Sequence, residues 1–363
     1  MQRRITASIG LAALIAATLA ACAAPPADSG GGGATSDFLP CAVSDLTGFD
    51  DKDFNELTYN GVKEAAKQLG VEPKAAESAS ESDYASNISN LIDENCDLIV
   101  TVGFALANAT RDAAQANPDV NFALIDSVVT DDTFATIQLD NVKPVLFDTA
   151  QAAVLAGYLA AGASKTGVVG TYGGMPFPSV TIFMDGYADG VAHYNEVHGT
   201  DVQVVGWDKA SQNGTFVGSF DDQVAAKTVT QNLLDQHADV IMPVAGTLFK
   251  ASVEAIKDGG GDQAIIGVNS DVFVSAPEDS AYYLTSVMKN LTTAAKEVTL
   301  AAADGKFDNT PYVGTLDNGG VDIAPTHDWE SKLDPALLDE VAQLKADIIS
   351  GAFVVESPSS PKS

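Results

Sequence analysis

Residues 38–70 read FLPCAVSDLTGFDDKDFNELTYNGVKEAAKQLG. The apolar run at 38–44 predicts a buried strand, and the acidic segment after it predicts a turn. From residue 54 onward, apolar side chains recur at the spacing of one helix face, and Gly70 supplies a stop signal. The periodic positions are Phe54, Leu57, Gly61, Val62, Ala65 and Leu69. This stretch therefore predicts one strand followed by one helix.

The same order of a short Val/Ile/Leu/Ala-rich run and a longer helix-like stretch continues along the chain. Candidate helices include 145–163 and 224–237. Further candidate strands are 97–102, 122–126, 166–172, 202–207, 239–244, 265–268 and 282–287. Strands that alternate with helices are typical of βαβ units, so the sequence predicts an α/β protein with parallel sheets.

Two runs of these units, one before and one after about residue 145, predict two doubly wound, Rossmann-like lobes. The last part of the chain adds one strand, one helix and an extended segment, which predicts several crossings that act as a hinge around a cleft. We expect the first lobe to comprise 38–145 and about 275–315, and the second 146–274 and about 316–352. The Ser- and Pro-rich residues 353–363 are predicted to be a disordered tail.

The N-terminus carries two arginines, an apolar stretch and the small-residue sequence LAAC at 19–22. This order predicts a signal peptide over 1–21. The LAAC sequence resembles the lipobox of bacterial lipoproteins, which implies a lipid on Cys22; the alternative is a cysteine near an ordinary cleavage site. The Pro-, Ser- and Gly-rich residues 22–37 predict a flexible tether, and no later segment reaches the roughly 18 apolar residues of a membrane span. We therefore expect a lipid-anchored protein at the extracytoplasmic face of the cell membrane.

The charge of the chain disfavours several partners. It has 49 acidic and 19 basic residues and a formal net charge of -30 at pH 7. Such a field repels phosphates, and the sequence has no Lys/Arg cluster that could release counterions from a polyanion. The phosphate-binding pattern GxxxxGK[ST] is also absent. The sequence therefore argues against nucleic acid as a partner and against nucleotide hydrolysis, and it favours a neutral ligand.

Two cysteines, Cys41 and Cys96, lie in the predicted mature domain. Outside the cytoplasm such a pair is a candidate disulfide. Each begins a predicted strand, and the first and third strands of a doubly wound sheet are parallel neighbours, so a bridge is geometrically feasible. Two unreacted buried thiols are one alternative. A metal-binding pair is another, although no further metal ligands lie near them in the sequence.

Polar and aromatic residues follow the predicted strands, at the end where ligands bind in open α/β sheets. Asp126 ends a buried strand, so its carboxylate needs a partner, and we consider it the strongest polar candidate for ligand contact. Asp51 and Asp53 could instead cap the helix that begins near Phe54. Phe54 itself could pack on the apolar face of that helix rather than against a ligand.

Sequence patterns for catalysis are missing. HExxH, GxSxG and closely spaced Cys/His sets do not occur, and the four histidines fall in predicted helices, exposed turns or the late crossing segment. The glycines within 167–174 fit tight turns better than a dinucleotide-binding GxGxxG pattern. We therefore expect no metal, no cofactor and no enzyme activity.

Seven motifs, in order along most of the mature chain, resemble one family. They are GFDDKDFNE (48–56), FALIDSVV (122–129), LAGYLAA (155–161), GGMPFPSVTIFMDGYADG (173–190), ADVIMPVAG (238–246), IIGVNSD (265–271) and LTSVMK (284–289). Together they resemble the basic membrane protein family, the PnrA-like substrate-binding lipoproteins of ABC importers. The resemblance implies the periplasmic-binding-protein type I fold. Because characterised members bind purine nucleosides, it also implies a nucleoside ligand.

The resemblance implies roles for individual residues. Phe54 would stack on one face of the base and Phe220 on the other, although Phe216 and Trp207 compete for the place of Phe220. Asp126 would be an acceptor at the edge of the cleft. The other candidate ligand contacts are Asn55, Asp51, Gly246, Asn269, Lys289 and Asp271.

Gly246, Asn269 and Lys289 resemble the ribose-binding set of the family. Asp271 would be a further contact or would support Lys289; alternatively, Asp271 and Lys289 could form a structural ion pair across the lobes. The chain departs from the family pattern at three points. It has AGTLFK at 245–250 where an AGGTG-like turn is usual, asparagine instead of aspartate at 269, and glutamate instead of glutamine at 56.

The resemblance predicts a receptor that closes on a nucleoside and delivers it to the permease and ATPase subunits of an ABC importer. We expect a monomer. A receptor for a sugar or another small polar solute is the alternative among binding proteins. A nucleoside-processing enzyme and a sensory or adhesive lipoprotein are the alternatives from other classes.

Overall fold

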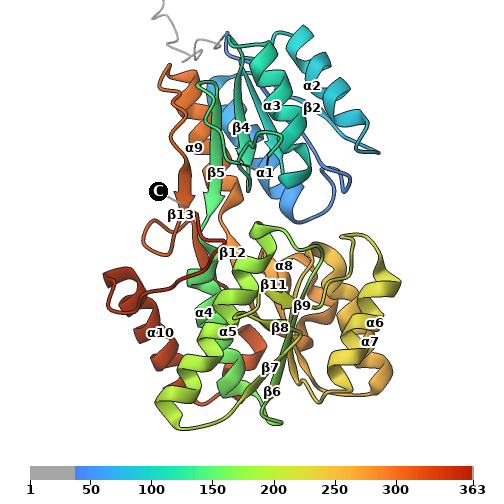
Figure 1. Cartoon of the computed structure of the whole chain (residues 1–363), viewed down its shortest axis with the longest axis vertical. Helices are drawn as coiled ribbons and strands as arrows, with labels where there is room; N and C mark the ends of the chain where they lie inside the picture. The colour runs from blue at the N-terminus through green and yellow to red at the C-terminus, as the bar shows by residue number, and fades with distance from the viewer. Residues whose placement is uncertain (1–36, 134, 362–363) are drawn as a thin grey trace, which may run out of the picture. The chain divides into compact units, whose positions relative to one another are not determined.

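The computed structural model describes residues 37–133 and 135–361, so the predicted signal peptide and Cys22 lie outside the described residues. In the described part, two six-stranded sheets form the centres of two lobes (Figure 1). This arrangement confirms the predicted α/β class with two lobes built on parallel strands. No helix in this part of the chain combines the length and the apolar character needed to cross a membrane.

The first lobe contains a fully parallel sheet with strand order β13-β5-β4-β3-β1-β2. Its strands are β1 (Pro40–Val43), β2 (Lys74–Ala76), β3 (Leu98–Val102), β4 (Asn121–Ile125), β5 (Val142–Phe147) and β13 (Tyr312–Gly314). Its helices are α1 (Phe54–Leu69), α2 (Asp83–Asp93), α3 (Ala107–Ala116), α9 (Leu291–Ala303) and the 3-10 helix η1 (Phe104–Leu106). In β1, Ala42 packs with Val62 of α1, whereas Cys41 and Val43 pack with Ile88 of α2. Helices therefore cover both faces of the sheet.

The second lobe contains the sheet β14-β12-β11-β10-β6-β7, in which only β14 runs antiparallel to its neighbour among the described strands. Its strands are β6 (Val168–Gly173), β7 (Gln203–Val205), β10 (Val240–Val244), β11 (Ala264–Asn269), β12 (Tyr283–Lys289) and β14 (Val321–Ile323). A hairpin of β8 (Trp207–Asp208) and β9 (Asn213–Gly214) lies beside this sheet.

Helices of several lengths complete the second lobe. They are α4 (Thr149–Ala163), α5 (Pro178–His198), α6 (Gln223–Leu234), α7 (Phe249–Gly259), α8 (Val272–Ser275) and α10 (Pro335–Ser350), with the 3-10 helices η2 (Gly246–Leu248), η3 (Pro277–Tyr282) and η4 (His327–Lys332). Helix α4 is almost entirely buried, which matches its apolar sequence. It packs against α5 at a very close distance because both helices carry glycine at the contact. A Cβ atom on Gly157 would lie 2.1 Å from the carbonyl oxygen of Tyr187.

Helix α1 begins where the acidic turn satisfies its free N–H groups. The Asp51 carboxylate accepts hydrogen bonds from the N–H groups of Asp53, Asn55 and Glu56 at 2.9–3.0 Å. The helix ends at Gly70, whose φ of 74° is the left-handed conformation that terminates many helices. The predicted helix and its stop are therefore confirmed, and Asp51 is a capping residue.

The chain crosses between the lobes after β5, after β12 and after β13, and these crossings are hydrogen-bonded to neighbouring segments. The N–H of Asp148 donates to the carbonyl oxygen of Gly314 at 2.8 Å, and the N–H of Asn290 donates to that of Gly320 at 2.8 Å. The Gln151 side chain accepts from the N–H of Leu316 at 3.0 Å. Neighbouring crossings of this kind form a hinge about which two lobes can close.

The predicted boundary near residue 275 is wrong. Strand β12 pairs with β11 and β14 in the second lobe, and α8 packs on β12, so residues 275–289 belong to the second lobe. The chain returns to the first lobe only at α9, which packs against α1. The pattern of alternating strands and helices locates β12 in the sequence but carries no information about which sheet it joins.

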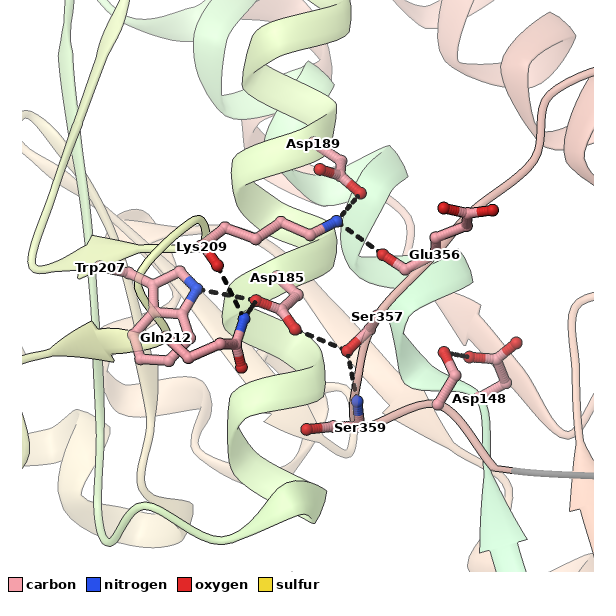
Figure 2. A network of polar contacts seen from close by, with 10 residues as sticks. Asp148, Asp185, Asp189, Trp207, Lys209, Gln212, Glu356, Ser357 and Ser359 are labelled. Carbon is pink, nitrogen blue, oxygen red and sulfur yellow. Dashed lines mark hydrogen bonds and ion pairs between the residues drawn. The ribbon is translucent and has the colours of Figure 1, made fainter.

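The C-terminal segment is also different from the prediction, because residues 353–361 dock on the second lobe (Figure 2). The Ser357 hydroxyl donates to the fully buried Asp185 at 2.6 Å, and the Ser360 hydroxyl donates to Asp148 at 3.0 Å. The Lys209 ammonium joins Asp189 to the carbonyl oxygen of Glu356, with 2.6 Å to each. The polar composition that predicted disorder instead supplies hydrogen bonds to acidic side chains.

Cys41 and Cys96 form a disulfide in the structure, with their Cα atoms 6.0 Å apart. Cys41 lies in β1, and Cys96 lies just before β3, the strand that pairs with β1. The bridge closes a loop with a sequence separation of 55 residues, and the loop contains α1 and α2.

Candidate functional site

A cavity of about 430 Å³ lies between the two lobes, at the carboxyl ends of strands from both sheets. The first lobe contributes residues that follow β1, β3 and β4, and the second contributes residues at the ends of β10, β11 and β12. This is the position where ligands bind in open α/β sheets, and the volume lies within the range of small-molecule sites. The cavity is therefore the candidate ligand site.

Aromatic rings from both lobes line the cavity. Phe54 comes from the first turn of α1, and Phe220 comes from the loop before α6. Phe104 of the first lobe stacks on Phe177 of the second, with ring centroids 4.2 Å apart and an interplanar angle of 22°. Phe177 is in turn 6.2 Å from Phe220 at 29°. The lobes thus contact each other through apolar rings beside the cavity.

Phe220 is the one of the three candidate opposing rings that the structure places at the cavity. Phe216 packs against the backbone of Gly173, where an added Cβ atom would lie 2.6 Å from the ring. Trp207 is buried and donates its indole N–H to Asp185 at 3.0 Å. Phe216 and Trp207 therefore contribute to the core of the second lobe.

Asp126 and Lys289 form a buried ion pair that joins the lobes across the cavity. Asp126 follows β4 and has a φ of 60°, a conformation that aspartate and asparagine tolerate better than most residues. Lys289 ends β12 and is 5 % exposed. Its ammonium also lies 4.9 Å from the ring centroid of Phe183 and 5.6 Å from that of Phe54. A fixed cation and a fixed anion therefore lie beside the Phe54 ring.

Asp271 does not pair with Lys289, so the alternative of an Asp271–Lys289 ion pair is wrong. Its carboxylate accepts from the N–H of Phe273 at 3.1 Å, which caps α8, and bonds to the His327 ring at 2.8 Å. Because both oxygens are engaged and the residue does not line the cavity, the structure gives Asp271 a structural position. It follows the end of β11 but points toward the segment that contains His327.

Asn55 and Asp51 lie at the edge of the cavity but use their polar atoms within the acidic turn. The Asn55 amide donates to Asp45 at 2.9 Å and to Thr47 at 2.8 Å, and its oxygen accepts from the N–H of Asp45 at 3.1 Å. Asp51 caps α1. These residues therefore hold the turn that positions Phe54.

Asp53 lines the cavity, as do Phe104 and Phe177, although the sequence patterns did not predict any of the three as a ligand contact. Asp53 is 6 % exposed and accepts a hydrogen bond from the Asn269 amide of the opposite lobe at 3.0 Å. Burial raises the pKa of Asp53 to about 7. The hydrogen bond from Asn269, the charge of Lys289 and the N–H of Phe54 oppose this rise, and the charge of Asp51 adds to it. The place of Asp53 directly before Phe54 indicates a possible ligand contact, but helix capping alone is enough to explain the acidic residues in that turn.

Gly246 and Asn269 are placed at the cavity by the second lobe. Gly246 begins η2 with a φ of 55°, and a Cβ atom added there would lie 3.6 Å from a carboxylate oxygen of Asp53. Asn269 ends β11 with a φ of 66°. The structure thus brings together Phe54, Asp126, Phe220, Gly246, Asn269 and Lys289 around one cavity, with Asp51 and Asn55 at its edge.

The chain is similar to known proteins along most of its length. A family model described as "ABC transporter substrate-binding protein PnrA-like" matches residues 39–356. The "ABC transporter nucleoside-binding protein BmpA" of Lactococcus lactis subsp. cremoris is 29 % identical over 98 % of this chain and 100 % of that protein. "Basic membrane protein A" of Borreliella burgdorferi is 31 % identical over 75 % of this chain and 74 % of that protein.

Two solved structures have the same fold. A solute-binding protein of an ABC transporter system from Aeropyrum pernix K1 has a TM-score of 0.76 and 25 % identity, covering 88 % of this chain and 94 % of that one. A solute-binding protein from Conexibacter woesei has a TM-score of 0.66 and 21 % identity, covering 88 % of this chain and 99 % of that one. Both confirm the two-lobe fold predicted from the sequence.

Proposed function

The chain belongs to the PnrA-like family of ABC transporter substrate-binding proteins, and from this membership we propose that it binds a nucleoside, with purine nucleosides preferred, and delivers it to a membrane permease. The site would hold the uncharged base between Phe54 and Phe220. The name of the Lactococcus lactis relative, which describes a nucleoside-binding protein, supports the ligand class.

One observation carries the proposal: aromatic rings from opposite lobes line an interlobe cavity that also contains a few fixed polar groups. Flat apolar faces supply contact area for a heterocyclic base, and a purine offers more area than a pyrimidine. Asp126, Lys289 and Asn269 supply polar atoms that would fix the orientation of the sugar or the base edge. The acidic surroundings disfavour a phosphate on the ligand.

Delivery to a permease completes the proposal. We infer that the chain is a monomer anchored through a lipid on Cys22, after removal of residues 1–21, at the extracytoplasmic face of the membrane. The sequence pattern at 19–22 and the family membership support this location. Replacement of Cys22 by alanine should move the protein from the membrane fraction to the soluble fraction of expressing cells. An unchanged membrane fraction would contradict the lipid anchor.

A thermal-shift panel tests the ligand class. Adenosine, guanosine, inosine, uridine, free adenine, ribose, glucose and AMP are each compared with buffer. A ligand at one hundred times its Kd stabilises the folded state by about 2.7 kcal/mol, and at equal concentration the ligand with the lowest Kd stabilises it most. Purine nucleosides should therefore raise the melting temperature most. A shift with glucose or ribose alone would replace the proposal by a sugar receptor. Release of free base from adenosine would indicate an enzyme.

A further inference from the structure

A buried carboxylate oxygen at the site lacks a partner. Oδ2 of Asp53 accepts from the Asn269 amide at 3.0 Å, whereas Oδ1 is shielded from solvent and has no partner with good hydrogen-bond geometry among the described residues. The N–H of Phe54 is close enough to lower the pKa of this carboxyl. A buried polar atom without a partner costs free energy, and the cost is larger for an ionised group. The side chain lines the interlobe cavity and Asn269 covers it from the opposite lobe, so a ligand that enters between the lobes and parts these two residues would come within reach of Oδ1.

The groups around Asp53 narrow the kind of ligand atom that fits. The charged groups that act on its carboxylate are Asp51 in the same turn and Lys289 at the end of β12. The residues that face it from β11 and η2 are Asn269 and Gly246, which are uncharged. Lys289 gives one hydrogen bond to Asp126, and an ammonium has three donors. A ligand atom here would thus meet both an acceptor and a cation.

A hydroxyl group matches this environment better than other groups do. It can donate its proton to Oδ1 of Asp53 while its oxygen faces the ammonium of Lys289, whereas an amino group on a base has no lone pair available for that cation. A phosphate oxygen is only an acceptor when ionised, so it cannot satisfy Oδ1. The environment therefore selects a neutral ligand that carries hydroxyl groups.

We propose that Asp53 contacts the ligand directly, and that its Oδ1 accepts a hydrogen bond from a sugar hydroxyl of the bound nucleoside. This inference rests on the proposed function and adds a residue that determines specificity for the ribose. Because Asn269 reaches Asp53 from the opposite lobe, the ligand bond forms where the two lobes meet. The Asp53 site would therefore favour lobe closure on a ribonucleoside over closure on an analogue without that hydroxyl.

The raised pKa of Asp53 is consistent with this role. Burial raises the pKa of the carboxyl to about 7; the Asp51 charge adds to the rise, and Asn269, Lys289 and the N–H of Phe54 oppose it. The ionised form is therefore costly until a further donor reaches Oδ1. A hydroxyl that donates to the carboxylate offsets part of this cost.

The test is a cycle of protein variants and ligand analogues measured by isothermal titration calorimetry. Wild type, Asp53→Asn and Asp50→Asn are titrated with adenosine and with its 2′-, 3′- and 5′-deoxy analogues. In the Asp53→Asn variant the amide oxygen stays with Asn269, so an NH₂ donor replaces the acceptor toward the ligand. Asp50→Asn makes the same charge change at an exposed position in the same turn and is the matched control.

For wild type and Asp50→Asn, removal of one particular hydroxyl should weaken binding about 10- to 100-fold, the usual range for a hydrogen bond to a charged group. For Asp53→Asn, removal of the same hydroxyl should change affinity less than about threefold. Equal losses in wild type and Asp53→Asn for all three analogues would overturn the role of Asp53. If wild type binds no nucleoside at all, the proposed function fails and this inference fails with it.

The pH dependence gives a second readout that does not depend on the ligand analogues. Protonation of Asp53 replaces the acceptor by a hydroxyl, so the affinity of wild type for adenosine should fall severalfold as the pH is lowered from 8 to 6. The Asp53→Asn variant should lose this fall. A fall of the same size in Asp53→Asn would show that another group causes it and would count against the proposal.

Discussion

The ion pair between Asp126 and Lys289 offers a test of the site that needs no ligand. The perturbation is Asp126→Asn, which keeps the size of the side chain and suits the positive φ of this position. The Lys289 ammonium would then lose its carboxylate partner. The side chains of Lys289 and Asp126 are 3 % and 10 % exposed, respectively, so the pair belongs to the buried class.

Burial sets the magnitude that we expect. Removal of one partner of a buried pair costs about 3–5 kcal/mol, whereas exposed pairs contribute about 0–1 kcal/mol. The rings of Phe183 and Phe54 remain close to the ammonium and could recover about 1 kcal/mol through cation–π attraction. We therefore expect Asp126→Asn to lower the free energy of unfolding by about 2–4 kcal/mol.

The assay is urea denaturation followed by circular dichroism on wild type, Asp126→Asn, Lys289→Met and the double variant. The double variant should be more stable than the sum of the single losses predicts, with a coupling of about 2 kcal/mol, because it leaves no uncompensated charge. The control is Asp262→Asn, which breaks the 3.0 Å ion pair with Lys165. The side chains of Asp262 and Lys165 are 88 % and 73 % exposed, so this change should cost less than about 1 kcal/mol. Additive losses in the double variant, or a loss from Asp126→Asn no larger than the control, would refute the reasoning.

Three further predictions concern the aromatic rings, the disulfide and the C-terminus. Phe54→Ala and Phe220→Ala should each weaken binding of the preferred nucleoside about tenfold or more in calorimetry, since stacking contributes about 1–3 kcal/mol per base; unchanged affinity would contradict the stacking assignment. Cys41 and Cys96 should resist thiol blocking without reductant in mass analysis, and reduction should cost about 2–4 kcal/mol of stability; two blocked thiols would disprove the bridge. Deletion of residues 356–363 removes the hydrogen bonds of the docked segment to the second lobe and should lower the melting temperature in a thermal-shift scan, and an unchanged value would show that docking adds no stability.

Local patterns in the sequence predicted most of the elements, although the predicted helix at 145–163 includes the end of β5 (Val142–Phe147), for which no strand was predicted. The apolar spacing from Phe54 to Leu69 and the stop at Gly70 match α1 as the structure has it. The position of the cavity also followed from the sequence, because parallel strands place the residues at their carboxyl ends on one edge of a sheet. Asp126 reaches the cavity for this reason. Phe220 reaches it from the loop before α6, and only the family resemblance pointed to that residue.

The parts that were missed depend on partners far away in the sequence. Asp53 lies in a turn whose acids are explained by helix capping, and only the position of Asn269, 216 residues later, shows that its carboxylate crosses the cleft. The Ser- and Pro-rich composition of the C-terminus indicates a loop, and its order depends on Asp185 within α5. The sequence contains these residues, but their contacts require the tertiary fold.

The central claim is that two lobes hold an uncharged base between rings contributed by each of them. The most direct test is a crystal structure of the protein with the purine nucleoside that gives the largest thermal shift. We predict that the base lies in the interlobe cavity with one face on Phe54 and the other on Phe220. A ligand bound elsewhere, or a base in the cavity that contacts neither ring, would contradict the account.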